Sequence, residues 1–215
     1  MSSSDRDTWN GRFASEAYVF GTRPATFVAD NAHYIPPRSH VLVPADGEGR
    51  NSVFLAELGH RVVATDIAEA GIAKARKLAD ARGVSVEFRH LDLQGWQWPN
   101  AEFDAVVAIF IQFAPPALRE EIFAGMKRAV RPGGVALLHG YTPKQLEYRT
   151  GGPTVVEQLY TEPLLRAAFA DWEMLHIEAC ERELDEGEGH KGRSAVIDMI
   201  ARRPALAVKA RATPF

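Results

Sequence analysis

Three acidic residues follow three successive predicted strands of this 215-residue chain, each near the point where its strand ends. Asp46 lies in the turn after the first strand, Asp66 ends the second, and Asp92 follows the third. Because ligands of open parallel sheets bind at the carboxyl ends of the strands, these carboxylates are expected to face one site. Asp66 is placed to accept hydrogen bonds from both hydroxyls of a ribose, and Asp92 from the exocyclic amine of an adenine. The row therefore predicts a site for an adenosine-containing ligand.

The turn after the first strand is rich in glycine. Residues 47–52, Gly-Glu-Gly-Arg-Asn-Ser, nearly satisfy the G-x-G-x-x-G/A pattern of dinucleotide binding, and Asp66 follows at a suitable distance. A nicotinamide-dependent oxidoreductase is therefore one alternative. Against it, Asp46 and Glu48 place negative charge in the turn, which is unfavourable beside a pyrophosphate but compatible with a sulfonium and an amino group. The chain also offers no second domain for a substrate.

Candidates for contact with a second substrate lie late in the chain. His139 and Tyr141 follow the fifth strand, and His190 and Arg193 lie in a Gly-rich loop near the C-terminus. We expect His190 and Arg193 to steer an anionic substrate and Tyr141 to line its pocket. No metal site is predicted, because the remaining histidines show no metal-ligand spacing: His33, His40, His60, His90 and His176.

These residues need a scaffold, and the chain alternates apolar β-branched runs with helical patterns. The predicted order of strands and helices implies a parallel sheet with helices on both sides. A turn is expected at residues 132–134, Pro-Gly-Gly. The expected strands are 41–43, 61–65, 84–91, 104–110 and 135–139, and the expected helices are 51–58, 68–82 and 115–130.

The last third of the chain changes character. A helix is predicted at residues 162–170, followed by strands at 172–184 and 194–201. The Gly-rich segment 185–192 joins these two strands, which predicts an antiparallel hairpin that closes one edge of the sheet. We find no internal repeat and no linker, so one domain is expected over residues 1–215, with mobile ends at 1–8 and 205–215.

Composition narrows the class of protein. The formal net charge is −3, whereas a general nucleic-acid binder usually carries a basic surplus. Cys180 is the one cysteine, so no disulfide can form within the chain. No apolar run approaches the ~18 residues of a membrane span, and the N-terminus lacks the apolar core of a signal peptide. These features predict a cytoplasmic protein, a monomer or homodimer, with a small-molecule partner and with neither nucleic acid nor membrane.

Several short motifs occur together in this chain. It resembles the class I S-adenosylmethionine-dependent methyltransferases, and within them the tellurite-resistance and thiopurine-methyltransferase-like branch. The resemblance covers residues 9 to 204, approximately. The motifs that carry it are 9–13 (WNGRF), 18–24 (YVFGTRP), 47–51 (GEGRN), 63–67 (VATDI), 103–106 (FDAV), 131–134 (RPGG) and 141–143 (YTP).

The resemblance implies S-adenosylmethionine as the methyl donor, with S-adenosylhomocysteine as product. It also implies an α/β fold with a doubly wound, mostly parallel seven-stranded sheet and an N-terminal helical cover formed by residues 1–35. Ile109 and Phe110 would flank the methionine part of the donor. The full set of donor-binding residues that it implies is Trp9, Arg12 and Phe20 in the cover, with Ala45, Asp46, Gly47, Asn51, Asp66, Ile67, Asp92, Leu93, Ile109 and Phe110 in the core.

The turn departs from the family pattern, strand-Asp-x-Gly-x-Gly. Val43 replaces the acid and Ala45 replaces the first glycine, so Asp46 is expected to hold the amino group of the donor instead. Alanine costs about 1 kcal/mol if position 45 needs a positive φ. This departure keeps open an alternative: a nucleoside-binding relic or regulatory protein without turnover.

The expected reaction is methyl transfer by in-line displacement, for which alignment of the reactants and exclusion of water supply much of the rate. A thiol or chalcogen acceptor needs little or no base. An oxygen or nitrogen acceptor would need one, worth ~10²–10⁴-fold in rate. The sequence therefore predicts a small-molecule acceptor and favours a thiol or chalcogen.

Overall fold

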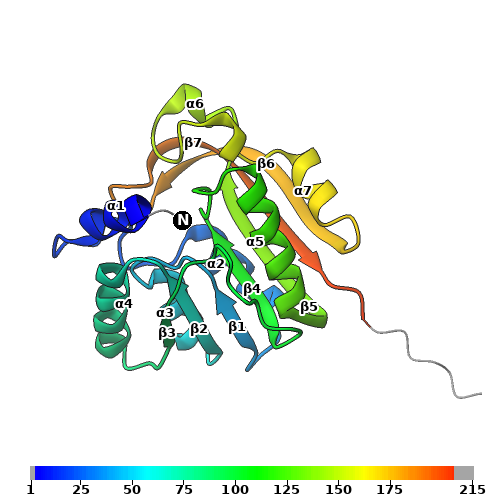
Figure 1. Ribbon diagram of the computed structural model, residues 1–215, viewed down its shortest axis with the longest axis horizontal. Coiled ribbons are helices and arrows are strands. Elements are labelled where there is room, and N and C mark those ends of the chain that lie inside the picture. Colours follow the sequence, from blue (N-terminus) through cyan, green and yellow to red (C-terminus); the bar gives the residue numbers. More distant parts are fainter. Residues whose placement is uncertain (1–2, 206–215) are drawn as a thin grey trace, which may run out of the picture.

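The computed structural model describes residues 3–205, which form a seven-stranded mixed sheet (Figure 1). The strand order is β3-β2-β1-β4-β5-β7-β6. Strands β1 to β5 pair in parallel, whereas β7 pairs antiparallel with both β5 and β6. This confirms the predicted doubly wound sheet with a C-terminal hairpin. The strands are β1 His40–Val43, β2 Arg61–Asp66, β3 Glu87–His90, β4 Phe103–Ile109, β5 Val130–Tyr141, β6 Glu173–Asp185 and β7 Lys191–Arg202.

Helices cover both faces of the sheet because successive side chains of its buried strands point to opposite sides. On one face, Val41 and Val107 pack with apolar residues of α2 and α3. On the other face, Leu42 and Val106 pack with apolar residues of α5 and α7. The helices are α1 Ser3–Phe13, α2 Thr26–Asn31, α3 Arg50–Glu57, α4 Glu69–Arg82, α5 Pro116–Ala129, α6 Gln145–Tyr148 and α7 Glu162–Ala168, with 3₁₀ turns η1 Ala32–Tyr34 and η2 Val156–Gln158.

The chain reverses its winding direction at β1. This strand pairs with β2 on one side and with β4 on the other. The connections that leave the carboxyl ends of β1 and β4 therefore diverge and leave a crevice between them, the usual ligand position in such sheets. The Gly-rich turn and residues Ile109 and Phe110 lie at this crevice.

Three predicted strand starts are wrong by three or more residues: β7 begins at Lys191 rather than Ser194, and the starts of β3 and β5 differ for local reasons. Strand β3 begins at Glu87 rather than Val84, because the Val84 N–H donates to the carbonyl of Ala79 and closes the end of α4. The turn expected at residues 132–134 lies within β5, where the pairing register with β4 slips. The backbone N–H of Gly133 donates there to the carbonyl of Arg203, so the segment is a bulge in the sheet.

The N-terminal segment lies against the core rather than apart from it. Helix α1 packs on α4 and extends toward the loop between β6 and β7 (Figure 1). Residues 3–8, expected to be a mobile end, belong to α1. The mobile tail expected at 205–215 lies, except for residue 205, outside the described residues. Within residues 3–205, no helix is long and apolar enough to span a membrane.

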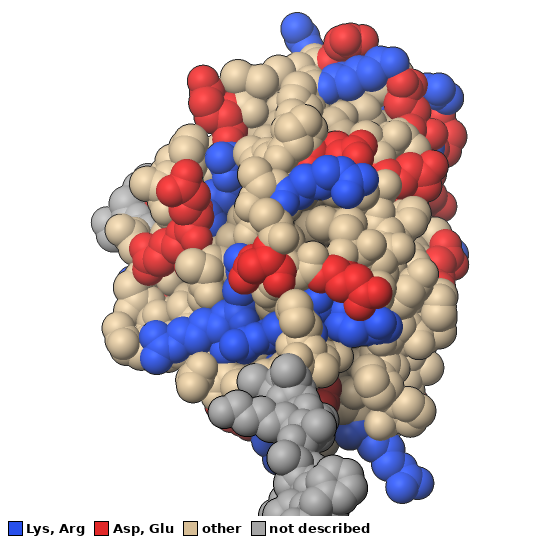
Figure 2. All heavy atoms as spheres, turned by 90° about the vertical axis from the view of Figure 1, so that its right-hand side faces the viewer, with Lys and Arg blue, Asp and Glu red and all other residues tan. Residues whose placement is uncertain are grey.

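Acidic and basic side chains are interspersed on the face shown in Figure 2. The structure contains several exposed ion pairs, among them Lys127 of α5 with Asp171 and Arg202 of β7 with Glu173 of β6. Exposed pairs of this kind contribute about 0–1 kcal/mol each to stability. Lys and Arg side chains also form a row across the lower middle of this face, with Asp and Glu side chains directly above it.

Candidate active site

A cavity of about 430 Å³ lies at the carboxyl ends of β1, β2 and β4, beneath the N-terminal segment. Its volume falls in the range of sites for small molecules and cofactors. Fourteen of the sixteen predicted site residues line it, so the structure brings most of the set together. They are Trp9, Arg12, Phe20, Ala45, Asp46, Gly47, Asn51, Asp66, Ile67, Leu93, Ile109, Phe110, Tyr141 and His190.

The two other predicted residues do not line the cavity. Arg193 lies on β7 rather than in a loop, and its guanidinium pairs with Glu181 at 3.1 Å. Asp92 accepts a hydrogen bond from the backbone N–H of Gln94 at 2.9 Å, although its neighbour Leu93 does face the cavity. Arg193 is thereby placed on the surface, away from any substrate that the cavity holds.

The Gly-rich turn adopts a left-handed backbone at three positions. The φ angles are 50° at Ala45, 63° at Gly47 and 89° at Gly49. Only Ala45 carries a Cβ, which is crowded in this region at a cost of about 1–2 kcal/mol. Position 45 therefore does require a positive φ, and the alanine there is strained.

Asp46, within this turn, is a buried carboxyl group that lines the cavity. Its Oδ2 accepts a hydrogen bond from the hydroxyl of Ser52, whereas Oδ1 has no hydrogen-bond partner. Burial raises the pKa of Asp46 to about 7, which outweighs the lowering by Ser52. Buried polar atoms are nearly always paired, so the unpartnered Oδ1 of Asp46 is an exception within a residue that lines the cavity.

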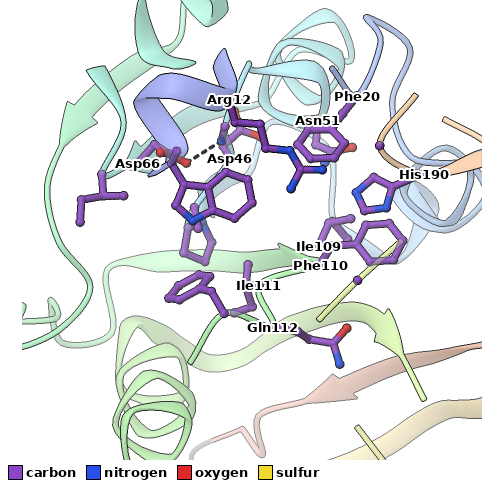
Figure 3. Close-up of a pocket in the computed structure, with 18 of the residues that line it drawn as sticks. Arg12, Phe20, Asp46, Asn51, Asp66, Ile109, Phe110, Ile111, Gln112 and His190 are labelled. Carbon is purple, nitrogen blue, oxygen red and sulfur yellow. Dashed lines mark hydrogen bonds between the residues drawn. The ribbon is translucent and has the colours of Figure 1, made fainter. Parts of the chain in front are cut away.

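Asp66, at the end of β2, connects the turn to the sheet. Its Oδ2 accepts from the Gly47 N–H at 2.7 Å, the bond drawn as a dashed line in Figure 3. Its Oδ1 accepts from the Ala68 N–H at 2.8 Å. Burial raises the pKa of Asp66. Each carboxylate oxygen has two lone pairs, so Asp66 can still accept hydrogen bonds from ligand hydroxyls on the cavity side.

His190 lies between two aromatic rings. It stacks on Phe20 with 4.5 Å between ring centroids and on Phe110 with 4.1 Å, and Figure 3 shows it beside Phe110 at the end of β4. Its Nδ1 lies 2.5 Å from the Tyr141 hydroxyl. Burial lowers the pKa of His190 to about 2, and the nearby Arg50 adds to this effect. The ring is therefore neutral, so the predicted steering of an anionic substrate by His190 would act through a hydrogen bond rather than through charge.

Glu48, in the Gly-rich turn, faces away from the cavity and fastens the N-terminal segment. It accepts hydrogen bonds from the backbone N–H groups of Val19 and Phe20 at 3.2 Å each. It also pairs with Lys74 of α4 at 2.5 Å, and both side chains are buried. Lys74 donates in turn to the carbonyls of Ser15 and Ala17. Glu48 thus holds the segment that brings Phe20 over the cavity.

A second fastening involves the loop after β6. Arg50 pairs with Glu186 at 2.9 Å, and Glu186 accepts from the Thr26 N–H at 2.9 Å. Asn51 accepts from the Ala25 N–H at 2.9 Å. Sequence reasoning missed the roles of Glu48, Arg50 and Glu186, because the groups they bind are largely backbone atoms that no side-chain pattern reveals.

His139 is buried beneath the site and does not line the cavity. Its Nδ1 lies 2.5 Å from Asp198, its ring stacks on Phe27, and its edge meets Phe110. His139 therefore supports Phe110 from below. Within residues 3–205, no cluster of three or more His, Cys, Asp or Glu residues has the arrangement of a metal site.

Residues 41–134 match a family described as "Methyltransferase domain". A relative from Mycolicibacterium smegmatis, described as a probable S-adenosylmethionine-dependent methyltransferase, is 30% identical over 74% of this chain and 58% of its own length. Demethylmenaquinone methyltransferase of Thermus thermophilus is 33% identical over 48% of this chain and 47% of its own. The chain thus spans about half the length of these curated relatives.

Solved structures share the fold. A protein from a study of the conversion of a disulfide bond into a thioacetal group during echinomycin biosynthesis has a TM-score of 0.73, with 21% identity and 93% of each chain covered. TehB from Haemophilus influenzae has a TM-score of 0.67, with 24% identity over 92% of this chain and 66% of its own. In sequence over residues 41–134, and in fold over most of its length, the chain is similar to S-adenosylmethionine-dependent methyltransferases.

Proposed function

We propose that this protein transfers a methyl group from S-adenosylmethionine to a small thiol or chalcogen acceptor in the cavity beneath the N-terminal segment. The observation that carries the choice of acceptor is the burial of His190 and Tyr141 beside Phe110. Burial lowers the pKa of His190 and raises the pKa of Tyr141, so neither side chain is suited to act as a base. The donor supplies a methyl group already activated by a sulfonium leaving group. The protein's part is then to align the acceptor and exclude water.

The donor half of the cavity is the polar half. Asp66 is proposed to hold the ribose, and Leu93 and Ile67 to enclose the adenine, with Asp92 as a further candidate for its amine. Asp46 and Gly47 are proposed to lie beside the methionine end, and Trp9, Arg12 and Phe20 to cover it. The residues present fit the donor, because Asp66 lines the cavity and its two carboxylate oxygens keep lone pairs for ribose hydroxyls.

The acceptor half is proposed to lie around His190, where burial lowers the pKa of His190 and the charged lining side chains Arg50 and Arg12 lower it further. Its walls include Phe113, Gln112, Tyr141 and His190. Burial raises the pKa of Tyr141, so its phenol stays protonated, and His190 does not take a proton at ordinary pH. An alcohol or amine acceptor would gain ~10²–10⁴-fold from a base that this half does not provide. A thiolate or selenide is nucleophilic without one.

A sulfur acceptor also agrees with one fold neighbour. That structure belongs to work on the conversion of a disulfide bond into a thioacetal group. At 21% identity it adds a precedent for sulfur chemistry in a similar fold and does not define a substrate here.

The test compares matched acceptors. An aromatic thiol and the phenol of the same shape would be incubated with protein and donor, and formation of S-adenosylhomocysteine would be measured from pH 5.5 to 9. We expect turnover of the thiol alone, at a rate that follows the thiol's own ionisation because the protein supplies no base.

A faster reaction with the phenol would contradict the proposed acceptor class. Binding of S-adenosylmethionine with no turnover of any thiol, selenide or phenol would favour the non-catalytic alternative. Binding of NAD in its place, measured by calorimetry, would favour the oxidoreductase.

A further inference from the structure

We propose that Asp198 and His139 are positioning residues for methyl transfer: the carboxylate fixes the His139 ring, and that ring holds Phe110 in the strained conformation that shapes the cavity wall. This inference rests on the proposed function, because it assigns two residues outside the cavity to the reaction within it. Asp198 lines no part of the cavity and acts on it through two other side chains.

Asp198 lies on β7 directly across from His139 on β5. Their side chains are 7% and 1% exposed, and Nδ1 of His139 lies 2.5 Å from one carboxylate oxygen. Arg182 of β6 donates to the other oxygen at 2.5 Å. Burial raises the pKa of Asp198, but the bond from His139 and the charge of Arg182 lower it by more, so the carboxyl group is ionised. A carboxylate only accepts, so Nδ1 carries the proton and the ring has one orientation.

The fixed ring of His139 contacts Phe110. The two ring planes lie at 75° with 4.6 Å between centroids, which is an edge-to-face contact. His139 also stacks on Phe27 of α2, with 5.2 Å between centroids and 15° between planes. The backbone N–H of Phe110 donates to the carbonyl of His139 at 2.8 Å. His139 thus holds both the backbone and the side chain of Phe110.

Phe110 needs this support because its backbone is strained. Its φ is 54°, in the left-handed region that bulky residues seldom adopt. Such a conformation persists only where the surrounding contacts over-determine it. In this conformation the Phe110 ring lines the cavity and stacks on His190 with 4.1 Å between centroids (Figure 3). A change in the orientation of His139 therefore moves the wall beside which the acceptor is aligned.

The neighbouring pair on the same two strands shows that this sheet does not need polar groups to hold together. Leu137 of β5 lies across from Ile200 of β7, on the same face as His139 and Asp198. Both are fully buried in an apolar cluster. Replacing both partners of a buried polar pair by apolar groups is often neutral or stabilising. Stability alone therefore does not account for His139 and Asp198, and the contact with Phe110 does.

The test replaces the polar pair by a copy of its apolar neighbour, His139→Leu with Asp198→Ile. The core stays filled, and Arg182, whose side chain is 28% exposed, can turn toward water. We expect this double variant to melt at or above the temperature of the parent, yet to lose about tenfold or more in kcat with an aromatic thiol, because the acceptor is misaligned. Its affinity for 5′-methylthioadenosine, which lacks the amino-acid part of the donor, should equal that of the parent in calorimetric titration.

Three further variants make the test specific. Asp198→Asn keeps an oxygen that can accept from Nδ1 of His139, so its kcat should stay within about threefold of the parent. Leu137→Ile with Ile200→Leu conserves volume at the neighbouring pair and is the matched control, with unchanged kcat. Phe110→Ala should lower kcat by itself, and adding it to the double variant should cause little further loss, because both changes act on one wall.

His139→Gln removes the ring but leaves Asp198 paired with Arg182. It should lose kcat as the double variant does, and it tests the same step if the double variant does not fold. Thermal melts followed by circular dichroism establish the fold of each variant.

Full kcat in the folded double variant, or in His139→Gln, would overturn the inference and leave the proposed function intact. Losses that multiply when Phe110→Ala is added would overturn the route through Phe110. If the parent methylates the phenol instead of the thiol, the proposed acceptor class fails, and the same comparison with the phenol still tests Asp198. If the parent methylates neither, the proposed function fails and this inference fails with it.

Discussion

The hydroxyl of Tyr141 lies 2.5 Å from Nδ1 of His190, and both side chains are buried. A protonated phenol beside a neutral imidazole can donate this hydrogen bond, which leaves the imidazole proton on Nε2. The pair therefore presents an N–H group, rather than a base, to the rest of the site. This relationship underlies the first prediction.

His190 should stay neutral from pH 8 down to pH 4. The pKa of His190 is about 2 in the folded protein and 6.5 for an unperturbed histidine, as in the unfolded chain. As the pH falls, the unfolded chain therefore binds the proton before the folded protein does. The contribution of neutral His190 to stability is thus complete above pH 6.5 and is lost below it, at up to ~1.4 kcal/mol per pH unit. Denaturant unfolding of His190→Gln should show a shallower loss between pH 6.5 and pH 4. Exposed His33→Gln is the control, and an equal change there would refute the assignment.

Ala45→Gly should stabilise the protein, because glycine removes the Cβ crowding at φ 50°. Glycine also raises the conformational entropy of the unfolded chain, which offsets part of this stabilisation. We therefore expect the free energy of unfolding to increase by about 0.5–1 kcal/mol. Ala101, in a loop away from the cavity, has the same φ and makes a matched control. Both variants should gain similar stability, but only Ala45→Gly should alter donor affinity. Unchanged donor affinity in both variants would show that the backbone strain at Ala45 has no effect on donor binding.

Glu48→Ala should free the N-terminal segment. Removing Glu48 leaves Lys74 buried without its ionic partner, which costs about 3–5 kcal/mol. Hydrogen exchange should accelerate at the amides of Val19 and Phe20, and donor affinity should fall because Phe20 no longer covers the cavity. Asp185→Asn breaks the exposed Arg23–Asp185 pair, which joins the same segment to the β6–β7 loop. The control variant should show the same hydrogen exchange and donor affinity as the parent. If the amide of Val19 stays protected from exchange in Glu48→Ala, Glu48 does not hold the N-terminal segment in place.

Asp66→Asn and Asp92→Asn should separate the two strand-end carboxylates. Asp66 lines the cavity and Asp92 does not, so we expect the former to weaken adenosine binding at least tenfold and the latter by less than threefold. Calorimetric titration with methylthioadenosine measures both without the amino-acid end of the donor. A large loss in Asp92→Asn would restore its predicted contact with the adenine amine.

Much of the fold could be predicted from the sequence because the buried strands are continuous apolar runs separated by helical patterns. The strands at residues 104–110 and 135–139 could be predicted for this reason. The start of β3 could not be predicted, because Val84 fits a strand as well as it fits the end of α4. The bulge at Gly133 depends on a bond to Arg203, which is distant in sequence.

The site residues that could be predicted are those whose role follows from their position at the end of a strand. The Gly-rich turn and Asp66 sit at strand ends, and sheet topology brings strand ends together. The charge state of His190 was not predictable from the sequence. Its position suggests an exposed loop residue that could carry a positive charge, whereas in the structure Phe20 and Phe110 shield its ring from water. Whether a loop residue is buried depends on segments that are distant in sequence and pack against it. The orientation of Glu48 likewise depends on the distant residues Val19 and Phe20.

The position of β7 between β5 and β6 has a consequence for synthesis of the protein. A ribosome delivers β6 before β7, so β6 emerges with no strand in the sheet to pair with. The outer edge of β5 stays open until residues 191–202 have left the exit tunnel, and an open edge can recruit other chains. Folding of this half therefore waits for the last strand, and a nascent chain stalled before residue 191 would be the form most in need of a chaperone.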